Sequence, residues 1–313
     1  MKAIRIHRFG GPEVLDLEDV PVPQPRENEL LVRIHAASVN PVDYKIRRGT
    51  VPWVTREMLP ITLGRDLSGT IESGGAGVDA FRLGEAVYAM LGGIDRGSYA
   101  EYVLVKPNEA AAKPVRLSHV EAAAVPLAGL TAWQGLFDHG NLQAGQIVLI
   151  HGGSGGVGHF AIQFAKAKDA TVLTTASDRK LDFVRELGAD RAIDYHSQRF
   201  EEMARDVDLV LDLVGGETQE RSWSVLKPGG ILVSALGEPS REKAVQKGVR
   251  GVGFRAQPNA AQLIEIGRLI DGCKVRPVIS ATYPLAEARE AQEQLERGYV
   301  HGKIVLKVSR TAG

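Results

Sequence analysis

The chain has 313 residues, 44% of them hydrophobic and 24% charged, with 38 Lys and Arg against 38 Asp and Glu. This length and composition predict a globular protein of about two domains, and the balanced charge argues against nucleic acid or an anionic membrane as a partner. No apolar run reaches the ~20 residues that a membrane-spanning helix needs, and the N-terminus lacks the apolar core of a signal peptide, so we expect a cytoplasmic protein without membrane insertion.

Residues 1–117 are predicted to form a β-rich domain. Short alternating or apolar segments have the pattern of strands at 2–7, 29–37, 70–73, 86–90 and 100–105. Pro21, Pro23 and Pro25 mark an extended connection, because proline cannot donate a hydrogen bond within a central strand. Short strands separated by proline and glycine indicate a compact β domain.

The pattern changes at Ser118 to alternating helices and strands. Ser118 and Glu121 fit a capping box, which predicts that a helix begins here. The expected strands follow at 147–150, 171–176, 192–194, 207–214, 230–236 and 249–254. The expected helices between them lie at 157–168, 180–187, 199–205 and 218–226. This alternation predicts an α/β domain of the Rossmann type, with a doubly wound parallel sheet.

The tail is expected to form a helix at 285–297 and a strand at 303–308. Because this strand comes after the Rossmann strands are complete, we expect it to return to the N-terminal domain. The predicted domains are therefore a discontinuous first domain, 1–120 with 274–313, and a dinucleotide-binding domain, 121–273.

The segment 146–168 carries the clearest motif. Gly153, Gly155 and Gly158 fit G-x-G-x-x-G between an expected strand and an expected helix. Such glycines allow a tight turn, close approach of backbone to a pyrophosphate, and close packing of helix on strand, while the helix N-terminus favours phosphate. We expect a dinucleotide to contact Gly153, Ser154, Gly155, Gly156, Val157 and Gly158. The alternative is a glycine-rich turn without a ligand.

The end of the next expected strand bears on the choice between NADH and NADPH. Spacing favours NADH, because Asp178 lies about 20 residues after the last glycine. Ser177, however, stands at the expected strand tip and is followed by Arg179 and Lys180, and a hydroxyl with two cations suits a 2′-phosphate. We therefore predict NADPH, with Tyr195 adding a second hydroxyl. Alternatively, the two cations form a solvated helical turn and Tyr195 is an ordinary half-buried tyrosine.

The sequence resembles the medium-chain dehydrogenase/reductase superfamily, in its zinc-independent quinone oxidoreductase (zeta-crystallin-like) branch. The resemblance covers nearly the whole chain. It rests on MKAIRIHRFGGPEVL at the start, AASVNPVDYKIRRG at 36–49, GRDLSGTIESGGAGVDAFRLGEAVYA at 64–89, GSYAEYVLV at 97–105, AAAVPLAGLTAWQGL at 122–136, HGGSGGVGHFAIQFAK at 151–166 and GKIVLKV at 302–308. It implies a GroES-like substrate domain, a Rossmann domain, and a substrate held in the cleft between them.

The zinc ligands of metal-dependent relatives are missing from the corresponding positions. Asn40 stands where the first ligand cysteine would be, and Leu127 where the second would be. Arg65 and Asp66 replace a His–Glu pair, and Cys273 is the single cysteine of the chain. The resemblance therefore implies chemistry without a metal, which needs a hydride donor, a polarising hydrogen bond and a proton.

The segment NPVDYK holds the catalytic candidates, because in relatives it lines the cleft beside the nicotinamide. The resemblance implies that Asn40 donates an amide N–H to a carbonyl oxygen, and that Tyr44 or Lys45 stabilises negative charge and supplies a proton. Alternatively, Asn40 forms a turn before Pro41, and Tyr44 and Lys45 belong to a solvated helical turn.

Further residues are expected at the nicotinamide end of the cofactor. Thr131 resembles a threonine that contacts the nicotinamide ring, although a hydrogen bond within its own helix is the alternative. Val214 ends a strand and is expected beside the ribose. The other candidates follow the last two strands: Ala235, Leu236, Gly237, Phe254 and Arg255. Phe254 could equally well be a core residue.

Together, these features predict a zinc-independent, NADPH-dependent oxidoreductase. It would reduce a small-molecule quinone, or the C=C bond of an α,β-unsaturated carbonyl (an enone), by hydride transfer, and the resemblance implies a homodimer. Two alternatives stay open. One is a non-catalytic protein that binds NADPH as a structural or sensing ligand. The other is an enoyl-thioester reductase, for which Arg47, Arg48 and Arg56 would form a basic patch.

Overall fold

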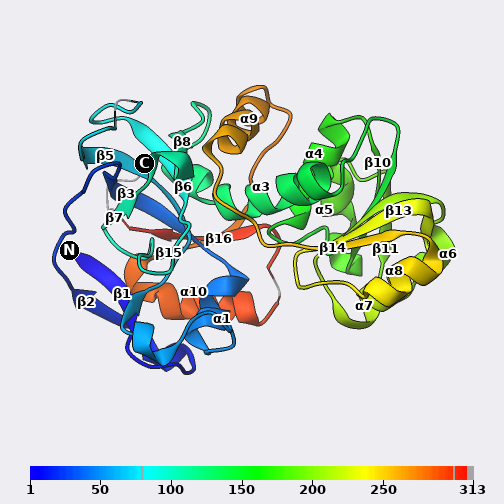
Figure 1. Ribbon diagram of the computed structural model, residues 1–313, viewed down its shortest axis with the longest axis horizontal. Coiled ribbons are helices and arrows are strands. Elements are labelled where there is room, and N and C mark those ends of the chain that lie inside the picture. The colour runs from blue at the N-terminus through cyan, green and yellow to red at the C-terminus, as the bar shows by residue number, and fades with distance from the viewer. Residues whose placement is uncertain (79, 299, 309–313) are drawn as a thin grey trace. The chain divides into compact units, whose positions relative to one another are not determined.

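The computed structural model describes residues 1–78, 80–298 and 300–308 (Figure 1). The chain divides into two compact units. The first contains Met1–Leu127, Pro258–Gly272 and Pro277–Gly313, and the second contains Ala128–Gln257 and Cys273–Arg276. No helix in the part of the chain that the structure describes is long and apolar enough to cross a membrane.

The first unit is built on a seven-stranded sheet with the order β15-β16-β3-β5-β6-β8, in which β7 also pairs with β3. Its strands are β3 (Leu30–Val39), β5 (Asp66–Gly74), β6 (Ala86–Met90), β7 (Tyr102–Val105), β8 (Ala110–Ala112), β15 (Ile279–Pro284) and β16 (Lys303–Lys307). A smaller sheet contains β1 (Lys2–Ile6), β2 (Asp16–Asp19) and β4 (Ile61–Thr62). The expected β-rich domain is confirmed.

The last strand of the chain returns to the first unit, as its position after the Rossmann strands predicts. β16 pairs antiparallel with β3, with Ile304 opposite Val39 and Lys307 opposite Ala36. In Figure 1 the red C-terminal strand accordingly lies beside a blue strand. The sequence prediction omits β15, whose residues are all half-buried or exposed, so that no buried apolar run marks the strand.

Short helices complete the first unit: α1 (Pro41–Arg47), α2 (His119–Ala123), α9 (Ala260–Asp271), α10 (Ala288–Glu296), and the 3₁₀ segments η1 (Pro12–Val14), η2 (Arg56–Met58), η3 (Pro107–Glu109) and η6 (Leu285–Glu287). The predicted capping box begins α2, since Ser118 Oγ accepts from Glu121 N at 3.3 Å and Glu121 Oε2 accepts from Ser118 N at 2.8 Å. The sequence pattern assigns α9 to the domain 121–273, whereas the structure groups it with the first unit. There the Tyr88 hydroxyl donates to the Leu263 carbonyl oxygen.

Successive side chains of β16 face opposite layers. Ile304 and Leu306 lie in an apolar core that includes Ile4, Ile6, Val39, Ile46 and Leu285. Val305 instead packs with Ala36, Ala123 and Ala124. Because side chains alternate along a strand, Lys303 points to the same layer as Val305.

The second unit contains a parallel sheet in the order β11-β10-β9-β12-β13-β14. Its strands are β9 (Ile147–His151), β10 (Thr171–Ala176), β11 (Arg191–Asp194), β12 (Val207–Asp212), β13 (Leu226–Ser234) and β14 (Arg250–Gly253). Its helical segments are α3 (Pro126–Trp133, mostly in this unit), the π-helix η4 (Gln134–His139), α4 (Gly158–Ala167), η5 (Asp178–Lys180), α5 (Leu181–Glu186), α6 (Phe200–Met203), α7 (Gly216–Ser222) and α8 (Arg241–Lys247). The predicted doubly wound sheet is confirmed, and its order reverses between β9 and β12, where such sheets bind ligands at their carboxyl edge.

One helix of this unit is shorter than the sequence pattern indicates. The pattern places a helix at 218–226 and a strand at 230–236, whereas α7 ends at Ser222 and β13 begins at Leu226. Trp223 is buried in the apolar core, so the chain turns inward directly after the helix. An irregular register between β12 and β13 accommodates the Pro-Gly-Gly sequence in the strand.

Candidate active site

The loop between β9 and α4 has the backbone geometry of a phosphate-binding turn. Gly152 makes the turn with a φ of 75°, one residue before the first glycine of the motif. A Cβ on Gly153 would lie 2.0 Å from Thr174 Oγ1, and a Cβ on Gly158 would lie 2.3 Å from the Gly152 carbonyl oxygen. A Cβ on Gly155 would meet the Gly152 carbonyl oxygen at 3.3 Å and no side chain within 4 Å. A ligand can therefore approach the backbone at Gly155, which is the role of the second glycine in this motif.

The start of α4 makes this loop suitable for an anion. The first N–H groups of a helix have no partner within the helix, and the helix dipole adds partial positive charge. The Thr175 carbonyl oxygen accepts from Gly153 N at 3.1 Å, and the Thr175 hydroxyl accepts from Gly152 N at 3.2 Å. Ser154, Gly156 and Val157 follow this anchored turn and lead into the helix. The loop residues predicted from the motif therefore lie together and fit a dinucleotide phosphate.

His151, the last residue of β9, is fully buried next to this loop. Its Nδ1 lies 3.1 Å from Thr175 Oγ1, and its Nε2 lies 2.9 Å from Ser222 Oγ. Burial lowers the pKa of His151 to about 4, so the imidazole is neutral at physiological pH. The side chain thus links β9 to β10 and α7.

Asp212 organises the neighbouring loop, and its role was not predicted from the sequence. Its Oδ1 accepts from Val214 N at 3.0 Å and from Gly215 N at 2.8 Å. Its Oδ2 accepts from Gln219 Nε2 at 2.8 Å and from Ser234 Oγ at 3.0 Å. The carboxylate therefore fixes the chain where β12 ends. The available signal was an acidic residue in the otherwise apolar strand VDLVLDLV.

Two apolar side chains are exposed at this edge of the sheet. Val214 is 52% exposed and Leu236 is 48% exposed. A Cβ on Gly152 would lie 3.4 Å from Val214 Cγ2, and a Cβ on Gly215 would lie 3.1 Å from Leu236 Cδ1. The loops after β9, β12 and β13 are therefore adjacent, so the two predicted residues stand close to the glycine loop.

The residues predicted for the 2′-phosphate also lie at the carboxyl edge. Ala176 pairs with Asp194, and Tyr195 N donates to the Ala176 carbonyl oxygen at 3.2 Å. Ser177 and Tyr195 therefore leave adjacent strands side by side, with Tyr195 57% exposed. The exposed Arg179 and half-buried Lys180 follow in η5, and burial lowers the pKa of Lys180.

The acidic residue of the adjacent strand is turned away from solvent. Asp194 Oδ1 accepts from His196 N at 3.1 Å, and Asp194 Oδ2 accepts from Ser197 Oγ at 2.5 Å. The Asp194 carboxylate therefore makes its hydrogen bonds within its own loop.

The remaining cofactor candidates occupy different settings. Thr131 is buried in α3, whereas Arg255 is exposed. Ala235 N donates to the Asp212 carbonyl oxygen at 3.2 Å, and Gly237 has a φ of 151°. Phe254 is buried, with its ring centroid 4.7 Å from that of His139, so its side chain contributes to the core.

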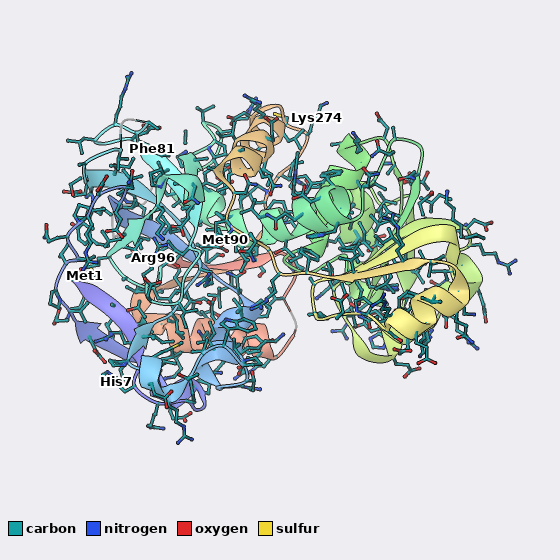
Figure 2. The ribbon with its side chains drawn as sticks, viewed as in Figure 1. Met1, His7, Phe81, Met90, Arg96 and Lys274 are labelled. Atoms are coloured by element: carbon teal, nitrogen blue, oxygen red, sulfur yellow. The ribbon has the colours of Figure 1, made fainter. Side chains whose placement is uncertain are left out.

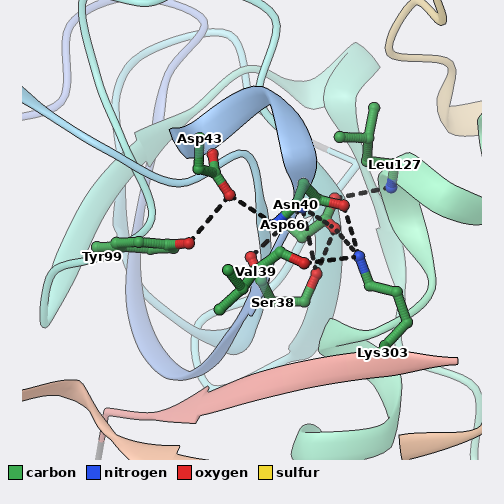
Figure 3. A network of polar contacts seen from close by, with 8 residues as sticks. All are labelled: Ser38, Val39, Asn40, Asp43, Asp66, Tyr99, Leu127 and Lys303. Carbon is green, nitrogen blue, oxygen red and sulfur yellow. Dashed lines mark hydrogen bonds and ion pairs between the residues drawn. The ribbon is translucent and has the colours of Figure 1, made fainter. Parts of the chain in front are cut away.

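A network of buried polar side chains lies in the first unit, where β3, α1, β5 and β16 meet (Figure 3). Asp66 Oδ2 accepts from Ser38 Oγ at 2.5 Å and from Asn40 Nδ2 at 2.9 Å, while its Oδ1 accepts from Leu127 N at 2.7 Å. Lys303 Nζ donates to Asn40 Oδ1 at 2.5 Å and lies 3.6 Å from Asp66 Oδ2. Burial lowers the pKa of Lys303, and the nearby carboxylates oppose that shift.

Asp43 braces the turn at the start of α1. Its Oδ2 accepts from Asn40 N at 2.8 Å and from the Tyr99 hydroxyl at 3.0 Å, as Figure 3 shows. Burial raises the pKa of Asp43 to about 6. The backbone of Asn40 is therefore held by one carboxylate and its side chain by another.

The three predicted catalytic residues differ in exposure. Asn40 is 3% exposed, Tyr44 is half-buried and Lys45 is exposed. Burial, followed by the Glu296 carboxylate, raises the pKa of Tyr44, so its hydroxyl stays protonated at neutral pH. Asn40 caps α1, and Tyr44 lies one helical turn later on the same face.

The arginines expected in a basic patch are not all at the surface. Arg47 is fully buried, and its Nη2 forms an ion pair with Glu296 Oε1 at 2.5 Å. Arg48 Nη2 donates to Glu296 Oε2 at 3.1 Å. Both side chains thus connect α1 to α10, which leaves less free positive charge than the sequence suggests.

Arg65 and Arg96 hold the loop that follows β6. The Arg65 guanidinium donates to the carbonyl oxygens of Leu91, Gly92 and Gly93. Arg96, labelled in Figure 2, donates to Glu109 Oε1 at 2.7 Å, and the same carboxylate oxygen accepts from Gly92 N at 2.8 Å. Arg65, which stands at a zinc-ligand position of the metal-dependent relatives, thus stabilises a loop through hydrogen bonds to its backbone.

Comparison with known proteins identifies the family. Two family descriptions match: alcohol dehydrogenase GroES-like domain at residues 26–115, and zinc-binding dehydrogenase at residues 187–306. A 2-methylene-furan-3-one reductase of Solanum lycopersicum is 36% identical, over 98% of this chain and 79% of that protein. The solved quinone oxidoreductase from Coxiella burnetii is 42% identical over 99% of each chain, with a TM-score of 0.93. The chain belongs to the medium-chain dehydrogenase/reductase superfamily, in its zinc-independent quinone oxidoreductase branch.

A further member of this branch has been solved with its cofactor. The Escherichia coli quinone oxidoreductase complexed with NADPH is 28% identical, over 98% of this chain and 100% of that chain, with a TM-score of 0.88. This medium-chain dehydrogenase/reductase is therefore an oxidoreductase that uses a nicotinamide cofactor.

In this oxidoreductase, the positions equated with zinc ligands converge in the first unit. Asn40 Nδ2 and Leu127 N both donate to the Asp66 carboxylate, and the Lys303 amine lies against the same group. Within residues 1–78, 80–298 and 300–308, no group of three His, Cys, Asp or Glu side chains is placed to hold a metal ion. The Asn40 amide and the Lys303 ammonium group thus lie around Asp66, where the metal-dependent relatives have zinc ligands.

Proposed function

We propose that this oxidoreductase uses NADPH to reduce quinones or the C=C bond of α,β-unsaturated carbonyls without zinc. The observation that carries the proposal is the pairing of two features. The cofactor loop is complete and meets no side chain at Gly155, whereas the positions of the zinc ligands hold an amide, a guanidinium, a carboxylate and the leucine Leu127. Under this proposal the cofactor supplies the hydride, and a hydrogen-bond donor takes the place of a metal ion in polarising the substrate oxygen.

The preference for NADPH rests on the end of β10. Ser177 and Tyr195 follow adjacent strands, so two residues with hydroxyl groups are neighbours here, and Arg179 adds an exposed guanidinium. A guanidinium binds a phosphate through charge-assisted hydrogen bonds, often in a bidentate fashion.

Bound NADPH supplies the hydride in this chemistry. In an enone, the hydride would add to the β-carbon, the C=C pair would shift to join the α-carbon to the carbonyl carbon, and the carbonyl π pair would move onto the oxygen. A proton would then add to the α-carbon of this enolate. In a quinone, one hydride and one proton give the hydroquinone. In both cases the protein must hold an oxygen that gains negative charge, and it must deliver a proton.

The residues of α1 are proposed to meet these two needs. Asn40 Nδ2 is the donor to the substrate oxygen, since an amide nitrogen carries two hydrogens. Tyr44 is the proton donor whose raised pKa keeps the hydroxyl protonated, and Lys45 is an exposed ammonium that can replace the proton. The names of two similar proteins, a quinone oxidoreductase and a furanone reductase, agree with substrates that carry such an oxygen.

Steady-state kinetics would test this function. The purified protein is mixed with NADPH or NADH and a panel of quinones and short enones, and the loss of nicotinamide absorbance is followed. Turnover with NADPH and at least one acceptor class is expected. Tight NADPH binding without turnover across the panel would overturn the proposal in favour of a sensing or structural protein.

Two further expectations accompany the proposal. A cytoplasmic location stays a prediction from the sequence, and cell fractionation tests it. A homodimer also stays a prediction, and light scattering of the purified protein measures the mass directly.

A further inference from the structure

Lys303 is a buried lysine that the proposed chemistry does not use. Its side chain is 3% exposed and shares a layer with Val305, Ala36 and Ala123. An ammonium group in such surroundings requires compensation by charge and hydrogen bonds. The described partners of Lys303 Nζ are Asn40 Oδ1 at 2.5 Å, the Val39 carbonyl oxygen at 3.3 Å and Asp66 Oδ2 at 3.6 Å.

The amide of Asn40 stands between the two opposite charges. At 3.6 Å, the ammonium of Lys303 and the carboxylate of Asp66 are an ion pair beyond hydrogen-bond distance. Asn40 connects them, because its Oδ1 accepts from Lys303 at 2.5 Å and its Nδ2 donates to Asp66 at 2.9 Å. A cation at the oxygen and an anion at the nitrogen side polarise the amide along one direction.

This arrangement also fixes which way the amide faces. With the opposite flip, Nδ2 would face the ammonium of Lys303 and Oδ1 would face the carboxylate of Asp66, and both contacts would be repulsive. Nδ2 has a second hydrogen besides the one given to Asp66. Its described partners are the Ser38 carbonyl oxygen at 3.4 Å and Ser38 Oγ at 3.5 Å, both at the long limit of a hydrogen bond.

We propose that Lys303 is a positioning residue for the reduction, which orients the Asn40 carboxamide and strengthens its Nδ2 as a donor to the substrate oxygen. This rests on the proposed function, because it needs Asn40 to contact that oxygen. Lys303 then acts through Asn40, from the C-terminal strand of the chain.

A purely structural role for Lys303 makes a different prediction. In that case the ammonium balances the buried charge of Asp66, and any loss of activity follows a loss of stability. Lys303→Met removes the charge and leaves Asp66 unpaired, so this variant alone cannot separate the two roles. Lys303→Met with Asp66→Asn removes both charges, which restores the balance without restoring the polarised amide.

The experiment compares these variants by kcat, KM, NADPH affinity from fluorescence, and thermal unfolding. We expect Lys303→Met to lower kcat about tenfold to hundredfold, less than the ~10²–10³ that loss of a complete oxyanion donor costs. The double variant should unfold near the wild-type temperature and keep the low kcat. NADPH affinity should change less than about twofold, since the cofactor loop is untouched.

Two controls complete the set. Lys307→Met removes a lysine from an exposed position of the same strand, so it should behave like the wild type. Lys303→Arg keeps the charge and should recover part of kcat. In an Asn40→Ala background, Lys303→Met should add less than about twofold, because the residue it acts through is gone.

The possible failures are distinct. If the wild-type protein turns over no acceptor of the panel, the proposed function fails and the positioning role of Lys303 fails with it. If the wild-type protein is active and the double variant recovers both stability and kcat, Lys303 is structural and only the positioning role is wrong. A wild-type kcat in Lys303→Met would likewise overturn the positioning role while the proposed function stands.

Discussion

The cofactor loop of the second unit and the polar network of the first are built in opposite ways. In the loop, a side chain would clash at Gly153 and Gly158, whereas a Cβ on Gly155 would meet only the Gly152 carbonyl oxygen, at 3.3 Å. In the network, the side chains of Asn40, Asp66 and Lys303 use most of one another's hydrogen-bonding capacity. The loop should therefore be sensitive to substitutions that add volume, and the network to substitutions that remove charge.

Removal of the buried carboxylate should have the largest effect. Asp66→Ala leaves the Lys303 ammonium buried without a counter-charge, so we expect the free energy of unfolding to fall by about 3–5 kcal/mol. Urea denaturation measures this change. Glu72→Ala is the matched control, because Glu72 lies on the same strand and forms an exposed ion pair with Arg33 at 3.5 Å. Its effect should stay below about 1 kcal/mol, and equal losses would contradict a charge-dependent network.

Acid should destabilise the second unit around His151. Burial lowers the pKa of His151 from 6.5 to about 4, so the unfolded state binds a proton in this window that the folded state does not. The stability that this group contributes above pH 6.5, about 3 kcal/mol, is therefore lost as the pH falls towards 4. Asp43 has the opposite effect on the pH dependence of stability. Its pKa is raised from 3.8 to about 6, so its protonation in acid favours the folded state.

Hydrogen-exchange protection factors of β9 at pH 7 and pH 5 measure this contribution. Protection of β9 should fall between these pH values in the wild type, and His151→Gln should remove much of that pH dependence. An equal fall in His151→Gln would contradict the role assigned to His151.

A side chain at Gly155 should weaken cofactor binding more than it weakens the fold. A Cβ on Gly155 would meet only the Gly152 carbonyl oxygen, at 3.3 Å, so Gly155→Val should lower the thermal unfolding temperature far less than Gly153→Val. NADPH affinity should fall about 100-fold, or about 2.7 kcal/mol, because the backbone can no longer approach the phosphate. Gly153→Val is the contrast, since its Cβ would lie 2.0 Å from Thr174 Oγ1 and should destabilise the second unit. Normal NADPH affinity in Gly155→Val would show that the phosphate lies elsewhere.

The cofactor preference should depend on one surface arginine. Arg179→Ala should weaken NADPH binding about tenfold and leave NADH unchanged, because only NADPH carries the 2′-phosphate. Arg185→Ala is a suitable control, since Arg185 is also exposed and pairs with Asp182 at 2.7 Å within α5. Fluorescence titration with both cofactors gives the ratio. Equal loss for NADH and NADPH would remove Arg179 from the phosphate site.

The same contrast explains what could be predicted from the sequence. The glycine loop is contiguous, so the motif at Gly153, Gly155 and Gly158 was enough to predict its tight turn and the helix that follows it. The parallel sheet was predicted for a similar reason, because alternating strands and helices leave a local pattern. The end of α7 was misplaced because the burial of Trp223 is a tertiary effect.

The polar network could not be predicted in this way. Asn40 and Lys303 are 263 residues apart, and the pairing of β16 with β3 brings them together. The sequence places Asn40 at a zinc-ligand position, but it does not reveal that an ammonium lies against the amide. Similarly, Arg47 has the sequence pattern of a surface arginine, and its burial against Glu296 depends on the packing of α1 and α10.

The central claim is metal-independent reduction with Asn40 as the donor to the substrate oxygen. The most direct measurement is kcat with NADPH and an active acceptor, before and after dialysis against a chelator, for the wild type and Asn40→Ala. We expect the chelator to have no effect, and Asn40→Ala to lower kcat about 10²–10³-fold with NADPH affinity unchanged. Loss of activity on chelation, or an unchanged kcat in Asn40→Ala, would contradict the account.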